Sequence, residues 1–267
     1  MEKLTPLYDP AKGPMKVMAL MSGSGTNVRR VLEHQEALKQ SQGASPFEII
    51  GLFSDNLSSN APEIAREYDL TVMIRDIRAF YQTRGIDRLD LSKRYLFDEE
   101  CIRIIGAFNP DILLFGGYMS IITPLMTEAF LAVNVHPGDL RVMKDGKRSW
   151  TGMHPVRDCL VKGEREVRAT THLVEPTVDG GRLLLLSEAL KLEIPQGRDL
   201  SNKADLKELE AFNQERLKKQ GDWKIMPLCF EFLARGYFAA DPRGNLYFRG
   251  KAIPEGVLME ELKAYLA

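Results

Sequence analysis

The stretch Ala132-Val133-Asn134-Val135-His136-Pro137 decides how the rest of the chain is interpreted. Its valines favour a strand, and Pro137 lacks the N–H that strand pairing needs, so a buried strand is expected to end at His136. Residues two apart on a strand share a face, which places Asn134 and His136 side by side at its carboxyl end. Ligands bind at this edge of parallel α/β sheets. A turn-capping Asn and a His bonded to backbone would give the same pattern, so the remaining sequence must decide.

A glycine-rich turn follows the first strand upstream of this stretch. Residues 15–21 form a mostly apolar run without alternation, typical of a strand covered on both faces, and lead through Ser22-Gly23-Ser24-Gly25-Thr26-Asn27 into a helical pattern. Glycines admit a ligand close to the backbone, and N–H groups at a helix start favour an anion. The turn matches neither the Walker loop nor GxGxxG. A structural turn capped by Thr26 is therefore an equal alternative to phosphate binding.

Strands and helices alternate through the first half of the chain. Strand patterns lie at 47–54, 70–74 and 111–115, and helical patterns at 61–68, 91–108 and 124–130. This alternation implies βαβ units with right-handed crossovers. The predicted fold class is α/β, with a mostly parallel twisted sheet and helices on both faces.

The second half is more polar. Residues 138–150 form a basic segment that is either a surface loop or a lid, since loops longer than about 12 residues are often functional. Strands are expected at 168–175 and 182–190, helices at 199–219, 223–234 and 254–265, and a hairpin around 241–244. We expect a short N-terminal arm, residues 1–14, and a single domain, residues 15–267, that ends in a helical and hairpin extension.

Composition excludes several classes of protein. The 267 residues include 36 Lys and Arg against 37 Asp and Glu, a net charge of −1, which argues against a dedicated nucleic-acid binder. The 3 cysteines form no CxxC or zinc-ligand spacing, which favours a reducing compartment. The N-terminus lacks the apolar core of a signal peptide, and no run reaches the roughly 18–20 apolar residues that span a bilayer. We expect a soluble, cytoplasmic protein that binds neither nucleic acid nor membrane.

Four short motifs, taken together, resemble one enzyme family. They are SGSGTN at 22–27, GGYMSIIT at 116–123, NVHP at 134–137 and VDGG at 178–181. In this order they resemble the phosphoribosylglycinamide formyltransferase family of folate-dependent enzymes. The similarity runs from about Met15 to the C-terminal hairpin, with insertions, and includes IMPLCFEFLARG at 225–236. It implies a Rossmann-like formyltransferase fold.

The resemblance implies transfer of a formyl group from 10-formyltetrahydrofolate, as co-substrate, to the primary amine of glycinamide ribonucleotide, with no metal. Attack of the amine gives a tetrahedral intermediate, whose oxyanion needs donors aimed at it in advance. The Asn134 amide and a protonated His136 suit this task. By resemblance, Asp179 keeps His136 charged and orders a water for proton transfer. Its alternative role is that of a turn residue before Gly180-Gly181.

The resemblance also implies binding residues and a division of the domain. The phosphate and ribose of the substrate would contact Gly25, Thr26, Asn27 and Asp222, and the folate would contact Arg94, Met119, Ser120, Ile121 and Ile122. Residues 15–110 would form a phosphate-binding half and 111–190 a catalytic and folate-binding half, with 191–267 as the extension. Arg94 could equally be an exposed helix charge, and for Asp222 the ribose contact is equally open. His154 and His172 also align with histidines of the family, but we expect core or turn roles for both.

Two segments depart from the family pattern. The segment after His136 becomes Gly138-Asp139-Leu140 and a longer loop carrying Lys144, Lys147 and Arg148, whose charges we expect to bind an anionic ligand. A helical insertion occupies 199–221. Three alternatives therefore remain open: a different phosphorylated amine as acceptor, hydrolysis of formyltetrahydrofolate, and a non-catalytic nucleotide- or folate-binding protein. A homodimer is also left open.

Overall fold

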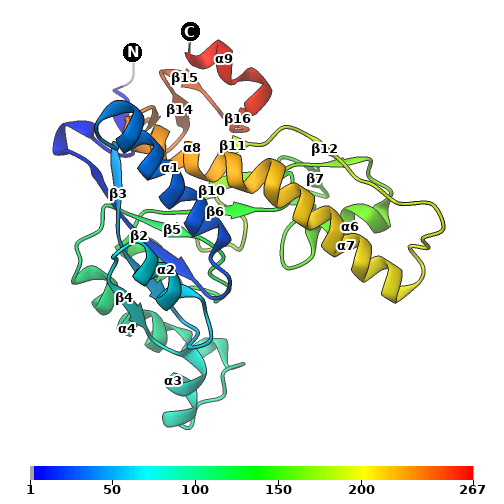
Figure 1. Ribbon diagram of the computed structural model, residues 1–267, viewed down its shortest axis with the longest axis horizontal. Coiled ribbons are helices and arrows are strands. Elements are labelled where there is room, and N and C mark those ends of the chain that lie inside the picture. The colour runs from blue at the N-terminus through cyan, green and yellow to red at the C-terminus, as the bar shows by residue number, and fades with distance from the viewer. Residues whose placement is uncertain (1–2, 267) are drawn as a thin grey trace.

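The computed structural model describes residues 3–266 and is built around an 8-stranded sheet (Figure 1). The strand order is β16-β11-β10-β6-β5-β2-β3-β4. The strands are β2 (Met15–Met21), β3 (Phe47–Ser54), β4 (Val72–Ile74), β5 (Ile112–Phe115), β6 (Ala132–His136), β10 (Thr170–Leu173), β11 (Leu183–Leu186) and β16 (Val257–Leu258). The neighbouring strands β4, β3, β2, β5 and β6 run parallel to one another. Strand β10 pairs antiparallel with both β6 and β11. The predicted mostly parallel sheet is confirmed.

Helices cover both faces of the sheet, as predicted. One face carries α1 (Thr26–Gln42), α2 (Ala61–Glu67) and α8 (Trp223–Ala234), and the other carries α3 (Ile77–Thr83), α4 (Arg94–Gly106) and α5 (Pro124–Ala129). Alternation along β2 explains the two cores. Val17 and Ala19 pack with the first set, whereas Met18 and Leu20 pack with the second. Burial on both faces is the reason that β2 appears in the sequence as an apolar run.

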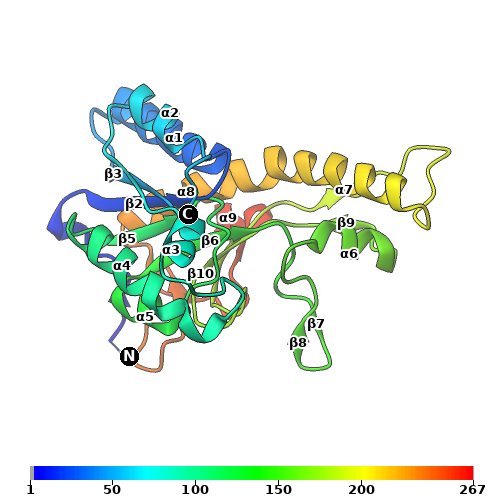
Figure 2. The ribbon, with the colours of Figure 1, turned by 90° about the horizontal axis from the view of Figure 1, so that it is seen from below.

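A second group of elements projects from one edge of the sheet (Figure 2). It contains the hairpin strands β7 (Met143–Lys144) and β8 (Lys147–Arg148), α6 (Pro155–Lys162), the paired strands β9 (Glu166–Val167) and β12 (Leu190–Lys191), and α7 (Lys203–Leu217). The prediction of one strand at 182–190 is therefore wrong, because this segment forms the separate strands β11 and β12. It breaks after Leu186, where the buried Ser187 Oγ accepts a hydrogen bond from Ala169 N (2.9 Å) and donates one to Glu188 O (2.9 Å).

One helical rod runs from α7 into α8 through a π-helical segment, η3 (Lys218–Asp222). The sequence predicts two separate helices, 199–219 and 223–234, and the interruption between them is wrong. A Cβ on Gly221 would lie 2.9 Å from Ala169 Cβ and 3.1 Å from Ser187 Oγ, so glycine here allows the helix to press against the sheet. π-segments are rare and frequently occur at functional sites.

The two ends of the chain meet in a small second sheet, ordered β1-β13-β14-β15. Its strands are β1 (Thr5–Pro6), β13 (Phe238–Ala240), β14 (Leu246–Phe248) and β15 (Lys251–Ala252). The segment expected as an arm thus contributes a strand, followed by η1 (Pro10–Lys12), while its residues 1–2 lie outside the described chain. The hairpin at the expected place is confirmed by the β13–β14 pairing.

The expected helix at 254–265 is wrong in its first part, because residues 257–258 form β16 and pair parallel with β11. The remainder is η4 (Met259–Glu261) and α9 (Leu262–Leu266), and a further short turn, η2 (Leu91–Lys93), precedes α4. Between residues 3 and 266, no helix has the length and apolar character needed to cross a membrane.

Candidate active site

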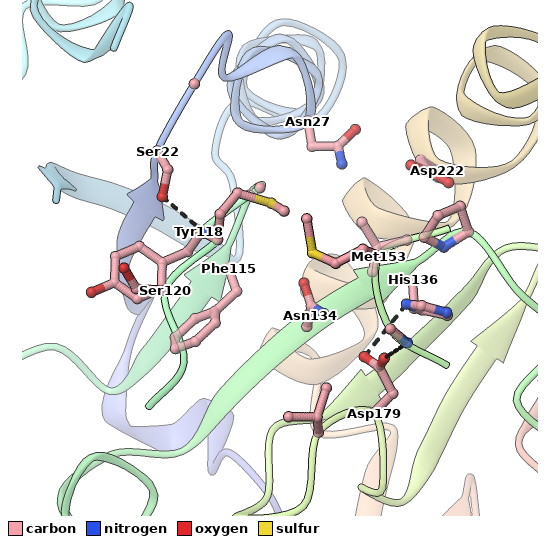
Figure 3. Close-up of a pocket in the computed structure, with 18 of the residues that line it drawn as sticks. Ser22, Asn27, Phe115, Tyr118, Ser120, Asn134, His136, Met153, Asp179 and Asp222 are labelled. Carbon is pink, nitrogen blue, oxygen red and sulfur yellow. Dashed lines mark hydrogen bonds and ion pairs between the residues drawn. The ribbon is translucent and has the colours of Figure 1, made fainter. Parts of the chain in front are cut away.

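A cavity of about 900 Å³ opens where β2, β5 and β6 end. Figure 3 shows side chains from opposite walls turned toward it. Its walls are the turn after β2, the loop after β5, the end of β6, the turn before β11 and the inner side of α7 and η3. The cavity thus lies at the strand edge that the sequence predicts for ligand binding.

Asn134, His136 and Asp179 meet at one end of the cavity, as expected from the sequence (Figure 3). His136 Nδ1 lies 3.4 Å from Asp179 Oδ1, and both side chains are almost fully buried. Asp179 Oδ2 accepts a hydrogen bond from Gly152 N (2.8 Å). The arrangement places an amide, an imidazole and a carboxylate around one small volume.

The second ring nitrogen of His136 is held by backbone. Nε2 lies 2.6 Å from Trp150 O, and since a carbonyl only accepts, Nε2 carries a proton and donates it. In the neutral ring, Nδ1 therefore presents its lone pair to Asp179. Burial lowers the pKa of His136, and it outweighs the opposing attraction of Asp179. Burial thus disfavours the imidazolium, and Asp179 favours it.

Asp179 sits in a strained turn that two glycines make possible. Its φ is 52°, in the left-handed region, which Asp tolerates better than most residues. A Cβ on Gly181 would lie 1.7 Å from Leu173 O, so this position accepts only glycine without displacement of β10. Asp179 is therefore a turn residue whose carboxylate also faces His136.

We expect Gly181→Ala to lower the free energy of unfolding by about 1–3 kcal/mol, the usual range for overpacking. The added methyl would force apart the turn and β10. Urea unfolding followed by circular dichroism measures this. Gly23→Ala is the control, because a Cβ at Gly23 meets nothing within 4 Å. Equal unfolding midpoints for the two variants would contradict the prediction.

His172 belongs to the site, although the sequence suggests only a core role. It lies opposite Asn134 across the β6–β10 pair. Its Nδ1 is 2.8 Å from Leu173 O and so donates, which leaves Nε2 to accept from Asn134 Nδ2 at 3.4 Å. Burial lowers the pKa of His172 to about 4, so the ring stays neutral. His172 thus orients the Asn134 amide, and the cross-strand register, which sequence alone does not reveal, is what identifies it.

The glycine turn and η3 face each other at the other end of the cavity. Gly25, at φ 66°, is the N-cap of α1, and Thr26 is the first residue of the helix rather than its cap. A Cβ on Gly25 would lie 2.6 Å from side-chain atoms of Ile64 and Met21. The helix therefore starts with backbone N–H groups directed at the cavity and no side chain covering them, which suits an anion.

Half-buried Asn27 and buried Asp222 both line the cavity beside this helix start (Figure 3). Asn27 lies close enough to favour the ionised form of Asp222, while the buried atoms Asn27 Oδ1 and Asp222 Oδ1 have no hydrogen-bond partner within the described chain. Asp222 is 7% exposed, and burial raises its pKa to about 7. Buried polar atoms without partners are costly and mark a place where a ligand can bind.

The loop after β5 is held from behind by buried side chains. Ser22 Oγ accepts from Met119 N (2.8 Å), Ser120 hydrogen-bonds Asp55, and Arg94 Nε donates to Ile121 O (2.5 Å). Arg94 is 5% exposed, so it is not a solvated helix charge, and it is absent from the described residues that line the cavity. Ile121 and Ile122 do line it, together with Met119 and Ser120.

The inserted helix α7 contacts the segment that follows the divergent loop. His154 Nδ1 lies 2.7 Å from Glu210 Oε1 of α7, and both residues line the cavity. His154 is thus neither core nor turn. The cations of the divergent loop were expected to bind an anionic ligand. Neither Lys144 nor Lys147 is among the described residues that line the cavity. Arg148 hydrogen-bonds the backbone carbonyls of Asp179 and Gly181 instead of facing the cavity.

Comparison with known families identifies the chain. Residues 15–214 match the family model described as formyl transferase. The chain belongs to the formyl transferase family. A curated relative, phosphoribosylglycinamide formyltransferase of Haemophilus influenzae, is 24% identical over 90% of this chain and 96% of its own length. The enzyme of the same name from Mycobacterium tuberculosis (strain H37Rv) is 26% identical over 67% of this chain and 73% of its own.

Solved structures share the fold of this formyltransferase. Phosphoribosylglycinamide formyltransferase from Coxiella burnetii has a TM-score of 0.65 at 18% identity and covers 92% of this chain and 99% of its own. Glycinamide ribonucleotide transformylase 1 from Symbiobacterium toebii has a TM-score of 0.63 at 21% identity, over 88% and 94% of the two chains. The predicted Rossmann-like formyltransferase fold is confirmed.

The formyltransferase site contains no evident place for a metal. Within residues 3–266, no group of three or more His, Cys, Asp and Glu side chains is arranged to hold an ion. The polar groups of the cavity are instead arranged as hydrogen-bond donors and acceptors around Asn134, His136 and Asp222.

The stability of the formyltransferase is expected to fall as pH rises from about 4 to about 7, because of Asp222. The pKa of this carboxyl is raised to about 7 by burial, so the folded protein holds the proton more tightly than the unfolded chain across that window. In Asp222→Asn this contribution vanishes. Urea unfolding at pH 5 and pH 8 measures it, and equal losses of stability in both proteins would refute the role of Asp222.

Proposed function

We propose that this formyltransferase transfers the formyl group of 10-formyltetrahydrofolate to the primary amine of glycinamide ribonucleotide, a step of purine biosynthesis. One observation carries the proposal. The Asn134–His136–Asp179 cluster and the start of α1, which has no side-chain cap, line a single cavity. A substrate with a reactive amine at one end and a phosphate at the other could place the amine at the cluster and the phosphate at the start of α1. The names of the curated relatives support it.

In the proposed reaction the amine attacks the formyl carbon, and negative charge develops on the formyl oxygen. The Asn134 amide has one N–H directed at His172 and a second that is available to this oxyanion. Preorganised donors of this kind are usually the largest single contribution to such reactions. Asn134 is therefore proposed as the principal oxyanion donor.

The proton of the attacking amine needs an acceptor, and the His136–Asp179 pair supplies one. With Nε2–H donated to Trp150 O, a neutral His136 offers the lone pair of Nδ1 beside a carboxylate. His136 Nδ1 takes a proton from the amine nitrogen. The protonated ring is then held to the Asp179 carboxylate by a charge-assisted contact. The same proton then passes to N10 of the folate as the C–N10 bond breaks, which gives the formylated amine and tetrahydrofolate.

The remaining assignments follow the same orientation of ligands. The phosphate is proposed to bind the N–H groups of Gly25, Thr26 and Asn27, and the ribose to bind Asp222. The folate is proposed to lie along Met119, Ser120, Ile121 and Ile122, with Arg94 supporting that loop through its hydrogen bond to Ile121 O. Residues 15–267 are proposed to act as one domain, with a phosphate-binding half, 15–110, and a catalytic and folate-binding half, 111–190.

A different phosphorylated amine is the second candidate acceptor. The observation that favours it is the position of α7, whose Lys207, Glu210 and Gln214 line the cavity. This helix lies within the insertion, so the wall nearest the acceptor differs from the family pattern. The reaction and the trio are the same in both proposals.

Formyl transfer monitored by absorbance separates these proposals. We expect turnover of 10-formyltetrahydrofolate that depends on glycinamide ribonucleotide and is saturable in it. Turnover without an acceptor would indicate hydrolysis and would overturn the proposal. Folate binding without turnover on this acceptor would favour the second candidate, which a series of other phosphorylated amines then tests.

A further inference from the structure

We propose that Arg148, from the inserted hairpin, is a positioning residue that holds the Asp179 turn in its catalytic geometry. The inference rests on the proposed function of the Asn134–His136–Asp179 cluster. Arg148 is not among the described residues that line the cavity. Arg148 therefore acts through Asp179 and not on a ligand.

The contacts of Arg148 are specific. Its Nη1 donates to Asp179 O and also to Gly181 O, the latter at 2.8 Å. Both carbonyls belong to the turn that carries the Asp179 carboxylate. One guanidinium thus joins the two sides of the turn at the residue whose φ is 52°. Sparsely populated backbone conformations persist when surrounding contacts over-determine them, and Arg148 supplies two such contacts.

The same inserted segment contacts both members of the proton-accepting pair. Its hairpin closes through a hydrogen bond from Ser149 N to Val142 O (2.9 Å). Immediately beyond it, Trp150 O accepts from His136 Nε2, and Gly152 N donates to Asp179 Oδ2. Movement of the Arg148 anchor is therefore transmitted to both His136 and Asp179.

Three charged or titratable groups face His136 and act on its protonation. Asp179 favours the charged ring, whereas Arg148 disfavours it through its own charge. His172, from β10, lies 3.7 Å from Asp179 Oδ1 and is neutral. If Arg148 acted through its charge alone, its removal would raise the pKa of His136. If it holds Asp179 in place, its removal lets the carboxylate move away, and the pKa of His136 falls.

The test compares Arg148→Met, Arg148→Lys and the control Lys147→Ala, a neighbouring exposed cation of the same hairpin. We expect Arg148→Met to lower kcat by about 10–100-fold, the scale of a displacement near 1 Å, with KM for both substrates nearly unchanged. Arg148→Lys, which keeps the charge but has a shorter side chain without the planar guanidinium, should recover only part. Lys147→Ala should match the parent protein.

Histidine-selective NMR titration gives the second readout, with the His136 signals assigned by their absence in His136→Asn. A fall of the His136 pKa in Arg148→Met supports the proposal. A rise of the His136 pKa in this variant overturns the proposal. So does a variant in which both kcat and the His136 pKa are unchanged. Far-ultraviolet circular dichroism of each variant shows whether the fold is retained. If Arg148→Met is unfolded, the same two measurements on Arg148→Lys test the proposal instead. The NMR result stands even if glycinamide ribonucleotide is not the acceptor, so the two proposals can fail separately.

Discussion

Replacing Asp179 with asparagine is expected to lower the turnover number about 10²–10⁴-fold, the scale of lost acid–base assistance. Asparagine has nearly the same shape and keeps an oxygen for Gly152 N, so the strained turn should survive. The change removes the negative charge 3.4 Å from His136 Nδ1. Without that charge the pKa of His136 falls further, and the pair no longer accepts the proton of the attacking amine.

The matched control is Asp145→Asn. Asp145 is also at φ 52°, in the exposed tip of the hairpin, so the same substitution is made in the same backbone conformation outside the site. It should leave turnover unchanged. Near-parental turnover in Asp179→Asn, with the control equally active, would remove Asp179 from the mechanism.

The second large effect is expected for Asn134→Ala, which should lower kcat about 10²–10³-fold, as loss of one oxyanion donor does. Because the oxyanion exists only after the amine attacks, kcat and kcat/KM should fall together, with little change in KM. Steady-state kinetics with each substrate varied in turn measures both parameters.

His172→Phe provides the comparison for Asn134→Ala. Phenylalanine keeps a ring in the buried position but cannot accept from Asn134 Nδ2, so the amide loses its orientation while its donor remains. A smaller fall in kcat than in Asn134→Ala is expected. A raised KM with unchanged kcat in Asn134→Ala would assign Asn134 to substrate binding instead.

The strands and the strand-edge cluster could be predicted because their signals are local. β2, β3 and β6 end where the apolar runs end, and alternation along β6 puts Asn134 and His136 at the same edge. The glycine turn was recognisable for the same reason. Its ambiguity as cap or cradle needed the structure, which makes Gly25 the N-cap and leaves the first turn of α1 uncovered.

The features that could not be predicted depend on contacts distant in sequence. His172 acquires its role from the β6–β10 register, and Arg148 from a turn more than 30 residues away. The pKa of His136 depends on burial outweighing a carboxylate, which requires the enclosed geometry. The continuity of the helix through residues 220–222 could not be predicted, because a glycine such as Gly221 serves equally to end a helix or to let one approach a sheet.

The uninterrupted rod from Lys203 to Ala234 also has a consequence for how such a pocket diverges. Each residue added to or removed from an α-helix turns everything beyond it by about 100°. A one-residue deletion in η3 would rotate Glu210 and Gln214 away from the cavity and bring other side chains of α7 in, while α8 kept its packing. A change of chain length at one place could thus exchange an entire pocket wall without any substitution in the core.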